Sequence, residues 1–225
     1  MSRLREPINI YNRECKPASS ANPYAAWDVP ASVRRFFIVG HRASTDAAFS
    51  LDDLAGGAGR MDILLNAANA ALHVAHGLRR DVEVGFLLLG PPDPPRFVRL
   101  ESFRLRNFQP DIRSNAALVR LALKDASRIE RETSPGVFGS KAGFEEALDR
   151  LGPAFVYLRE GGKDIRDAIL PADATFVLSD NQDLTAAEER SVLDRGAVPL
   201  GLGPIPLHTD HAIALVNNEL DRRNV

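Results

Sequence analysis

Short apolar runs recur along the chain between polar stretches, a pattern typical of buried strands. The run at residues 36–40 ends at a glycine, and a second run at 82–89 is followed directly by Gly90. Residues 97–108 alternate imperfectly between apolar and polar positions, which predicts a hairpin or an edge strand. The predicted buried strands are residues 36–40, 82–89, 155–158, 175–178 and 197–200.

Apolar residues at helical spacing predict helices between these strands. Thr185, followed three residues later by Glu188, is a capping-box pattern that marks one helix start. Strands that alternate with helices predict an α/β fold, with a mostly parallel sheet and helices on both faces. The predicted helices are approximately residues 61–76, 115–131, 141–150, 164–170, 185–195 and 209–223.

Residues 1–33 mix charges, prolines and small residues without periodicity. We interpret them as an N-terminal extension, loosely ordered or packed on the surface, that covers a site, joins a dimer or has no such role. Residues 34–225 are expected to form a single domain, with residues 131–141 as a loop inside it.

Composition narrows the class of protein. Of the 225 residues, 44% are hydrophobic and 26% charged, as in soluble globular proteins, and no apolar run reaches the roughly 20 residues of a membrane helix. The only cysteine, Cys15, excludes an internal disulfide and favours a cytoplasmic protein. The net charge of −2 gives no general attraction to nucleic acid, so a phosphate-binding patch would have to be local. Basic residues between Arg79 and Arg131 are candidates for it.

The sequence at residues 201–207, Gly-Leu-Gly-Pro-Ile-Pro-Leu, joins the last predicted strand to the last predicted helix. Its glycines permit close backbone approaches and its prolines stiffen the turn. Thr209 or Asp210 is placed to cap the helix that follows. A rigid turn with free backbone amides suits a small polar ligand, although an ordinary strand-to-helix connection fits the local features equally well.

Several common sites are missing. There is no G-x-G-x-x-G motif after a first strand and no Walker loop, which argues against a Rossmann-type enzyme. In open parallel sheets, ligands bind beyond the carboxyl ends of the strands. The ends after Leu158, Leu178 and Leu200 would form one pocket if these strands are neighbours.

Histidines occur twice at i, i+3 spacing, at 73 and 76 and at 208 and 211. Neither pair has the carboxylate of an H-E-x-x-H motif, and no cysteine lies near, so we expect no metal site. His41 ends the first strand and either lines a substrate pocket or is a loop histidine without that role.

Two separated blocks of sequence resemble one known family. The first comprises residues 37–41 (Phe-Ile-Val-Gly-His), 49–54 (Phe-Ser-Leu-Asp-Asp-Leu) and 59–62 (Gly-Arg-Met-Asp), and the second comprises residues 202–204 (Leu-Gly-Pro) and 216–223 (Val-Asn-Asn-Glu-Leu-Asp-Arg-Arg). In this order they resemble the archaeal tRNA pseudouridine N1-methyltransferases of the SPOUT superfamily. The resemblance spans about residues 35–223. It implies a deep trefoil knot near the C-terminus, S-adenosyl-L-methionine as cofactor, an RNA substrate, normally tRNA, and a homodimer with sites at the interface.

The resemblance also implies where the cofactor binds. Ser179 stands where the family commonly has glycine, which narrows the site slightly. Ala212 falls where the family usually has a cysteine, and Cys15 is remote, so either no thiol-dependent step occurs or that cysteine mainly shapes the pocket. The cofactor-binding residues carried over are Leu158, Ser179, Leu202, Gly203, Pro204, Ile205, Pro206, Leu207 and Ala212.

Methylation of a ring nitrogen requires in-line approach to the methyl group and loss of the N1 proton. Within the 59–62 motif, Asp62 is the first candidate to accept that proton or orient the base, and Arg60 is a candidate anchor for a phosphate or carboxylate. Asp210, directly after the turn, is a second acid candidate. Each residue also has a purely structural interpretation. Asp62 fits an acid at a helix N-terminus, Arg60 a solvated surface arginine, and Asp210 an N-cap.

The sequence therefore predicts an S-adenosylmethionine-dependent methyltransferase acting on N1 of pseudouridine, in RNA or as a free nucleoside. One alternative is a SPOUT enzyme with another target, such as a ribose hydroxyl or another base nitrogen. Another is a non-catalytic protein that keeps cofactor or RNA affinity, as the absent cysteine suggests. The polar run 217–219 inside the last helix is expected to have a structural role, across a dimer interface or in holding the knot.

Overall fold

The computed structural model describes residues 30–223 apart from 125 and 172. Most of the predicted N-terminal extension, residues 1–29, and with it Cys15, therefore lies outside the described residues.

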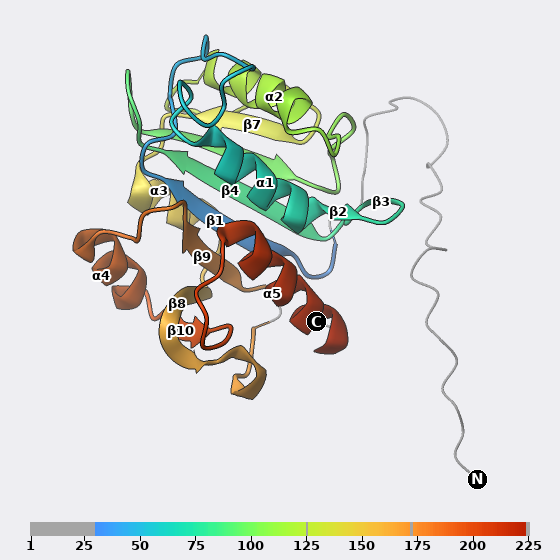
Figure 1. The fold of residues 1–225 in the computed structure, drawn as a ribbon, viewed down its shortest axis with the longest axis vertical. Coiled ribbons are helices and arrows are strands. Elements are labelled where there is room, and N and C mark those ends of the chain that lie inside the picture. The colour runs from blue at the N-terminus through green and yellow to red at the C-terminus, as the bar shows by residue number, and fades with distance from the viewer. Residues whose placement is uncertain (1–29, 125, 172, 224–225) are drawn as a thin grey trace.

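In the described part of the chain, eight strands form one sheet in the order β10–β8–β9–β1–β4–β5–β7–β6 (Figure 1). The first five strands in that order run parallel, and the last three continue the sheet in antiparallel pairs. The predicted α/β fold with a mostly parallel sheet is confirmed. The strands are β1 (Arg34–Gly40), β4 (Val82–Leu88), β5 (Arg96–Glu101), β6 (Arg131–Ser134), β7 (Val137–Ser140), β8 (Phe155–Asp164), β9 (Thr175–Ser179) and β10 (Val198–Gly201).

Helices cover both faces of this sheet, as predicted. Side chains alternate along β1: Phe36 and Ile38 enter the core under α1, α2 and α5, whereas Phe37 and Val39 enter the core under α3 and α4. Figure 1 shows α1, α2 and α5 across the face turned to the viewer. The helices are α1 (Met61–Leu72), α2 (Ile112–Lys124), α3 (Phe144–Arg150), α4 (Ala186–Asp194) and α5 (Thr209–Arg223).

The region predicted as a loop at residues 131–141 is instead a hairpin, formed by β6 and β7. Gly136, with φ of 74°, makes its turn in the left-handed region that glycine adopts at little cost. Strand β5 pairs antiparallel with both β4 and β7, so it is not an edge strand, and it ends at Glu101 rather than continuing to residue 108.

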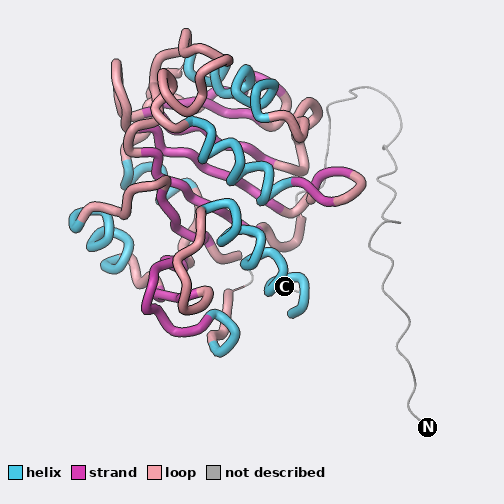
Figure 2. Tube along the Cα trace, viewed as in Figure 1, coloured by secondary structure: helices cyan, strands magenta, loops and turns pink. Residues whose placement is uncertain are grey.

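Four predicted helices were too long, and the one predicted at 141–150 begins only at Phe144. The first of the other three ends at Leu72, because the next residues pair as the short strands β2 (His73–Val74) and β3 (Gly77–Leu78), the hairpin that projects beyond α1 in Figure 2. The second covers Ile112–Lys124 rather than residues 115–131. Strand β8 continues to Asp164, which leaves only a 3₁₀ turn at Ile165–Asp167 where a helix was expected.

The last helix has the predicted bounds, but neither Thr209 nor Asp210 lies before its first turn as an N-cap. The Ala212 N–H donates to the His208 carbonyl at 2.9 Å, and the Thr209 hydroxyl donates instead to the Ser179 carbonyl at 2.7 Å. Buried Asn217 donates from Nδ2 to the Ala71 carbonyl at 3.3 Å, which ties α5 to α1. This contact lies within one chain, and the roles expected for residues 217–219, across a dimer interface or in holding the knot, stay predictions.

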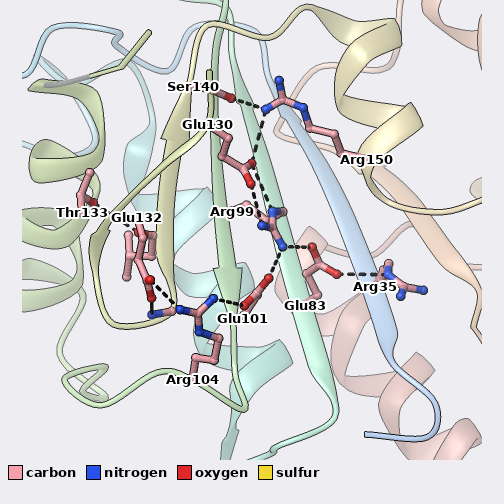
Figure 3. Close-up of polar contacts among 12 residues, drawn as sticks. Arg35, Glu83, Arg99, Glu101, Arg104, Glu130, Glu132, Thr133, Ser140 and Arg150 are labelled. Atoms are coloured by element: carbon pink, nitrogen blue, oxygen red, sulfur yellow. Dashed lines mark hydrogen bonds and ion pairs between the residues drawn. The ribbon is translucent and has the colours of Figure 1, made fainter. Parts of the chain in front are cut away.

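A network of arginines and glutamates lies on β1, β4, β5 and the adjoining hairpin (Figure 3). Arg99 is at its centre, with a side chain only 14% exposed, and donates to Glu83 at 2.8 Å and to Glu130 at 2.7 Å. Burial opposes charge on Arg99, but hydrogen bonds and charge from Glu130 and Glu83 outweigh it and raise the guanidinium pKa. Arg99 and Arg104 were candidates for a phosphate-binding patch, and both pair with glutamates of the same chain; the Arg99 side chain is mostly buried, whereas the Arg104 side chain is 39% exposed.

Candidate functional site

The carboxyl ends of β8, β9 and β10 lie at one edge of the sheet. Strand β8 pairs in parallel with β10 on one side and with β9 on the other. The three strands are neighbours, which is the condition that the predicted pocket required, although β8 continues past Leu158 to Asp164. Their arrangement gives one binding edge of the kind that open parallel sheets offer to ligands.

Strand β8 is interrupted beside β10. Its pairing with β10 jumps from Tyr157 opposite Pro199 to Lys163 opposite Leu200, so the residues between them leave the ladder. At Gly162 a Cβ would lie 2.6 Å from the backbone carbon of Leu200, a distance that atoms do not tolerate. Glycine is required here because two backbone segments are in direct contact. Leu158 begins the excursion, half-buried, within the proposed cofactor region.

The 202–207 turn follows β10 and is mostly exposed. Gly203 has φ of 142°, and a Cβ there would meet nothing within 4 Å, so the backbone faces open space. Ile205 is 71% exposed although it is apolar. Ser179, at the end of β9, is half-buried, and its carbonyl is held by Thr209 at the start of α5. Ala212, by contrast, is buried in the main core.

Arg60 and Asp62 lie at the start of α1. Arg60 donates from Nε and from one terminal nitrogen to the two carboxylate oxygens of Asp62, at 3.0 and 3.1 Å. The Arg60 backbone is left-handed, with φ of 69°, a conformation that costs of order 1 kcal/mol and concentrates at functional sites. Gly59 before it is also left-handed, and a Cβ there would lie 1.8 Å from the Arg42 carbonyl oxygen. The motif therefore fixes an arginine–carboxylate pair at a defined place, half-exposed to solvent.

A second charged cluster lies beside this pair. His41, the first residue after β1, has Nδ1 3.3 Å from Asp180 and Nε2 3.1 Å from Glu188. Its pKa is raised above the ordinary value, first by the hydrogen bond with Asp180 and against the effect of burial. The pKa of Arg60 is raised chiefly by its hydrogen bonds with Asp62, and the charge of Asp180 adds to this. The start of α1 and the ends of β1 and β9 thus share one electrostatic environment.

Sequence reasoning missed Asp180 and Glu188 as site residues. Asp180 directly follows the apolar run of β9, a position at which polar residues reach a ligand-binding edge, and this signal was available. Glu188 was assigned only to a capping box, which the structure confirms: its carboxylate accepts from the Thr185 N–H at 2.8 Å. Asp210, the second acid candidate, is half-buried in the first turn of α5.

The described residues hold neither a metal-binding cluster nor a membrane-spanning helix. They include no group of three or more His, Cys, Asp or Glu side chains arranged to hold a metal ion. The rings of His208 and His211 pack edge to face, with centroids 5.8 Å apart. Among the described helices, none has the length and apolar character needed to cross a bilayer.

This chain is similar in sequence to archaeal tRNA methyltransferases. The tRNA (pseudouridine(54)-N(1))-methyltransferase of Methanocella arvoryzae is 47% identical over 193 residues, covering 85% of this chain and all of the relative. The protein of the same name from Halobacterium salinarum is 43% identical over 194 residues, covering 84% of this chain and 96% of the relative. Both alignments leave about one seventh of this chain unmatched.

A solved structure has a similar fold. The crystal structure of Archaeoglobus fulgidus Nep1 bound to S-adenosylhomocysteine superposes with a TM-score of 0.59 at 13% identity, covering 86% of this chain and 99% of that chain. At this identity the likeness concerns the fold. A family model described as "Putative SAM-dependent RNA methyltransferase" matches residues 33–225. This chain therefore belongs to that family of S-adenosylmethionine-dependent RNA methyltransferases.

Proposed function

We propose that this protein transfers a methyl group from S-adenosyl-L-methionine to N1 of pseudouridine at position 54 of tRNA. The observation that carries the proposal is the 47% identity to an enzyme with this name along that enzyme's whole length. The neighbouring strand ends and the Arg60–Asp62 pair, at the edge where ligands bind in such sheets, support it.

For the cofactor, we propose the region between the 202–207 turn, Ser179 and Leu158. Half-buried Leu158 and Leu202 offer apolar surface to an adenine ring, and the open backbone at Gly203 offers polar groups. The cofactor, when bound, supplies an activated methyl group on a sulfonium. The other residues proposed to line this site are Pro204, Ile205, Pro206, Leu207 and Ala212.

For the substrate, we propose that Asp62 accepts the N1 proton of pseudouridine or orients the base through it. Arg60 holds both carboxylate oxygens in a bidentate pair, and each oxygen retains a further lone pair for N1–H. The exposed face of Arg60 is placed to meet a phosphate. Asp210 remains the second candidate acid. Because Ala212 has no thiol, the proposed chemistry uses none.

We further propose a homodimer and a deep trefoil knot. Ile205 and Leu215 are apolar and 71% and 46% exposed on the turn and on α5, which suits burial against a second copy. The contact between Gly162 and Leu200 supports a chain threaded closely past the β8 excursion. Sedimentation at micromolar concentration tests the dimer, and a monomer would contradict it.

For the chain as a whole, we propose a single methyltransferase domain over residues 34–225, preceded by an accessory extension, in a cytoplasmic protein. The single cysteine of the sequence supports the compartment, and the one continuous sheet of the described residues supports the single domain.

The test is transfer of tritium from labelled S-adenosylmethionine to tRNA transcripts that carry pseudouridine or uridine at position 54. The proposal predicts label only on the pseudouridine transcript. Equal labelling of both transcripts would indicate another target, such as a ribose hydroxyl. Cofactor binding without transfer to either transcript would indicate a non-catalytic binding protein.

A further inference from the structure

His41 lies between two carboxylates at the edge of the proposed cofactor site. Its Nδ1 faces Asp180 at 3.3 Å and its Nε2 faces Glu188 at 3.1 Å. An ionised carboxylate only accepts hydrogen bonds, and a neutral imidazole carries one N–H. Both contacts are therefore hydrogen bonds only when the ring is protonated at both nitrogens. This arrangement selects the imidazolium form and leaves neither nitrogen available as a base.

Asp180 joins the ends of β1 and β9. Its side chain is fully buried, and its carboxylate accepts from the backbone N–H groups of His41 and Gln182, each at 2.9 Å. Its own N–H donates to the Val39 carbonyl at 2.9 Å. Ser179 directly precedes it, and the Ser179 carbonyl is held by the Thr209 hydroxyl. The Asp180 carboxylate therefore holds the β9 end against the end of β1, and the adjacent Ser179 carbonyl makes the contact with α5.

Glu188 connects the same ring to α4. Its carboxylate also accepts from the N–H and the hydroxyl of Thr185, both at 2.8 Å, and its side chain is 13% exposed. Among the described residues, the charged groups in contact with the His41 ring are Asp180 and Glu188, and Arg60 acts on Asp180 at longer range. Loss of the ring's charge would leave two poorly solvated carboxylates without their shared cation.

We propose that His41, as an imidazolium held by Asp180 and Glu188, is a positioning residue that fixes the Ser179 edge of the cofactor site. The identity of the ligand rests on the proposed function. The raised pKa of His41 supports this role, because it keeps the ring charged at pH values where an ordinary histidine is neutral. When the ring loses its proton, one of its two hydrogen bonds is lost. The Ser179 side of the cofactor site is then held less rigidly.

The test is calorimetric binding of S-adenosylhomocysteine between pH 5.5 and 9, which needs no methyl transfer. Wild-type affinity is expected to fall as pH rises through the raised pKa of His41. His41→Gln is expected to bind roughly tenfold more weakly at pH 6.5 and without this pH dependence, because a neutral amide does not replace the two charge-assisted hydrogen bonds of the imidazolium. His76→Gln, in the β2–β3 hairpin, removes a histidine elsewhere and should retain the wild-type profile.

A second variant keeps the test independent of folding defects. Glu188→Gln preserves the capping box, which accepts glutamine at this position, but removes one negative charge beside His41. The pH midpoint of binding should therefore move to lower pH in a folded protein. An unchanged midpoint, or His41→Gln binding within about twofold of wild type with the same pH profile, would overturn the positioning role alone. Failure of the wild type to bind the probe at any pH would overturn the proposed function and this role with it.

Discussion

Replacement of Arg99 by methionine tests the arginine–glutamate network most sharply. The methionine fills similar volume but leaves Glu83, Glu101 and Glu130 without their shared cation. Removal of one partner from a buried ion pair costs about 3–5 kcal/mol, because the remaining charge is desolvated and uncompensated. Arg99 is 14% exposed, but Glu83, Glu101 and Glu130 each keep a second arginine partner, so we expect a loss near the lower end of this range. That is a large share of the about 5–15 kcal/mol by which domains are stable.

Urea denaturation of matched variants measures this loss. The control is Arg113→Met, which breaks the 2.7 Å pair with Asp52, where the two side chains are 61% and 71% exposed. An exposed pair of this kind contributes about 0–1 kcal/mol. The slope of tRNA affinity against salt should be the same for Arg99→Met and wild type, because Arg99 is not available to a phosphate. If Arg99→Met cost no more than Arg113→Met, the network would not be the stabilising element described here.

Three further predictions concern the site. Asp62→Asn should lower the single-turnover rate of methyl transfer about 10²–10⁴-fold with little change in tRNA affinity, and an unchanged rate would remove Asp62 from the chemistry. Gly162→Ala should lower the free energy of unfolding by about 1–3 kcal/mol in urea, because its Cβ would lie 2.6 Å from Leu200, whereas Gly143→Ala, with open space around it, should cost much less. The raised pKa of His41 gives stability that is fully present below its unfolded value of 6.5 and is lost as pH rises through the folded value. The free energy of unfolding should therefore fall over that window in wild type and not in His41→Gln.

The sequence predicted the parallel half of the fold well, because its strands are short apolar runs and its last helix is bounded by strong signals. The glycines and prolines of the 201–207 turn precede α5, and the final arginines end it at the predicted residue. The hairpin of β6 and β7 was missed because Arg131–Ser134 is polar and largely exposed, so it has no hydrophobic pattern. Its pairing is decided by contact with β5, which is a tertiary interaction.

The candidate site was predicted where chemistry depends on local motifs and missed where it depends on distant contacts. Arg60 and Asp62 are two residues apart and their pairing is local. Asp180 and Glu188 are 139 and 147 residues from His41, and only the sheet order brings them together. The capping-box pattern was a sufficient explanation for Glu188 in the sequence. Nothing in that pattern indicated its second contact, which is with His41.

Mass spectrometry of nucleosides from the tRNA of cells with and without this protein tests the central claim most directly. The methylated nucleoside predicted is N1-methylpseudouridine at position 54, present with the protein and absent without it. An unchanged amount of that nucleoside, with loss of a methyl group from a ribose or another base, would contradict the proposed function.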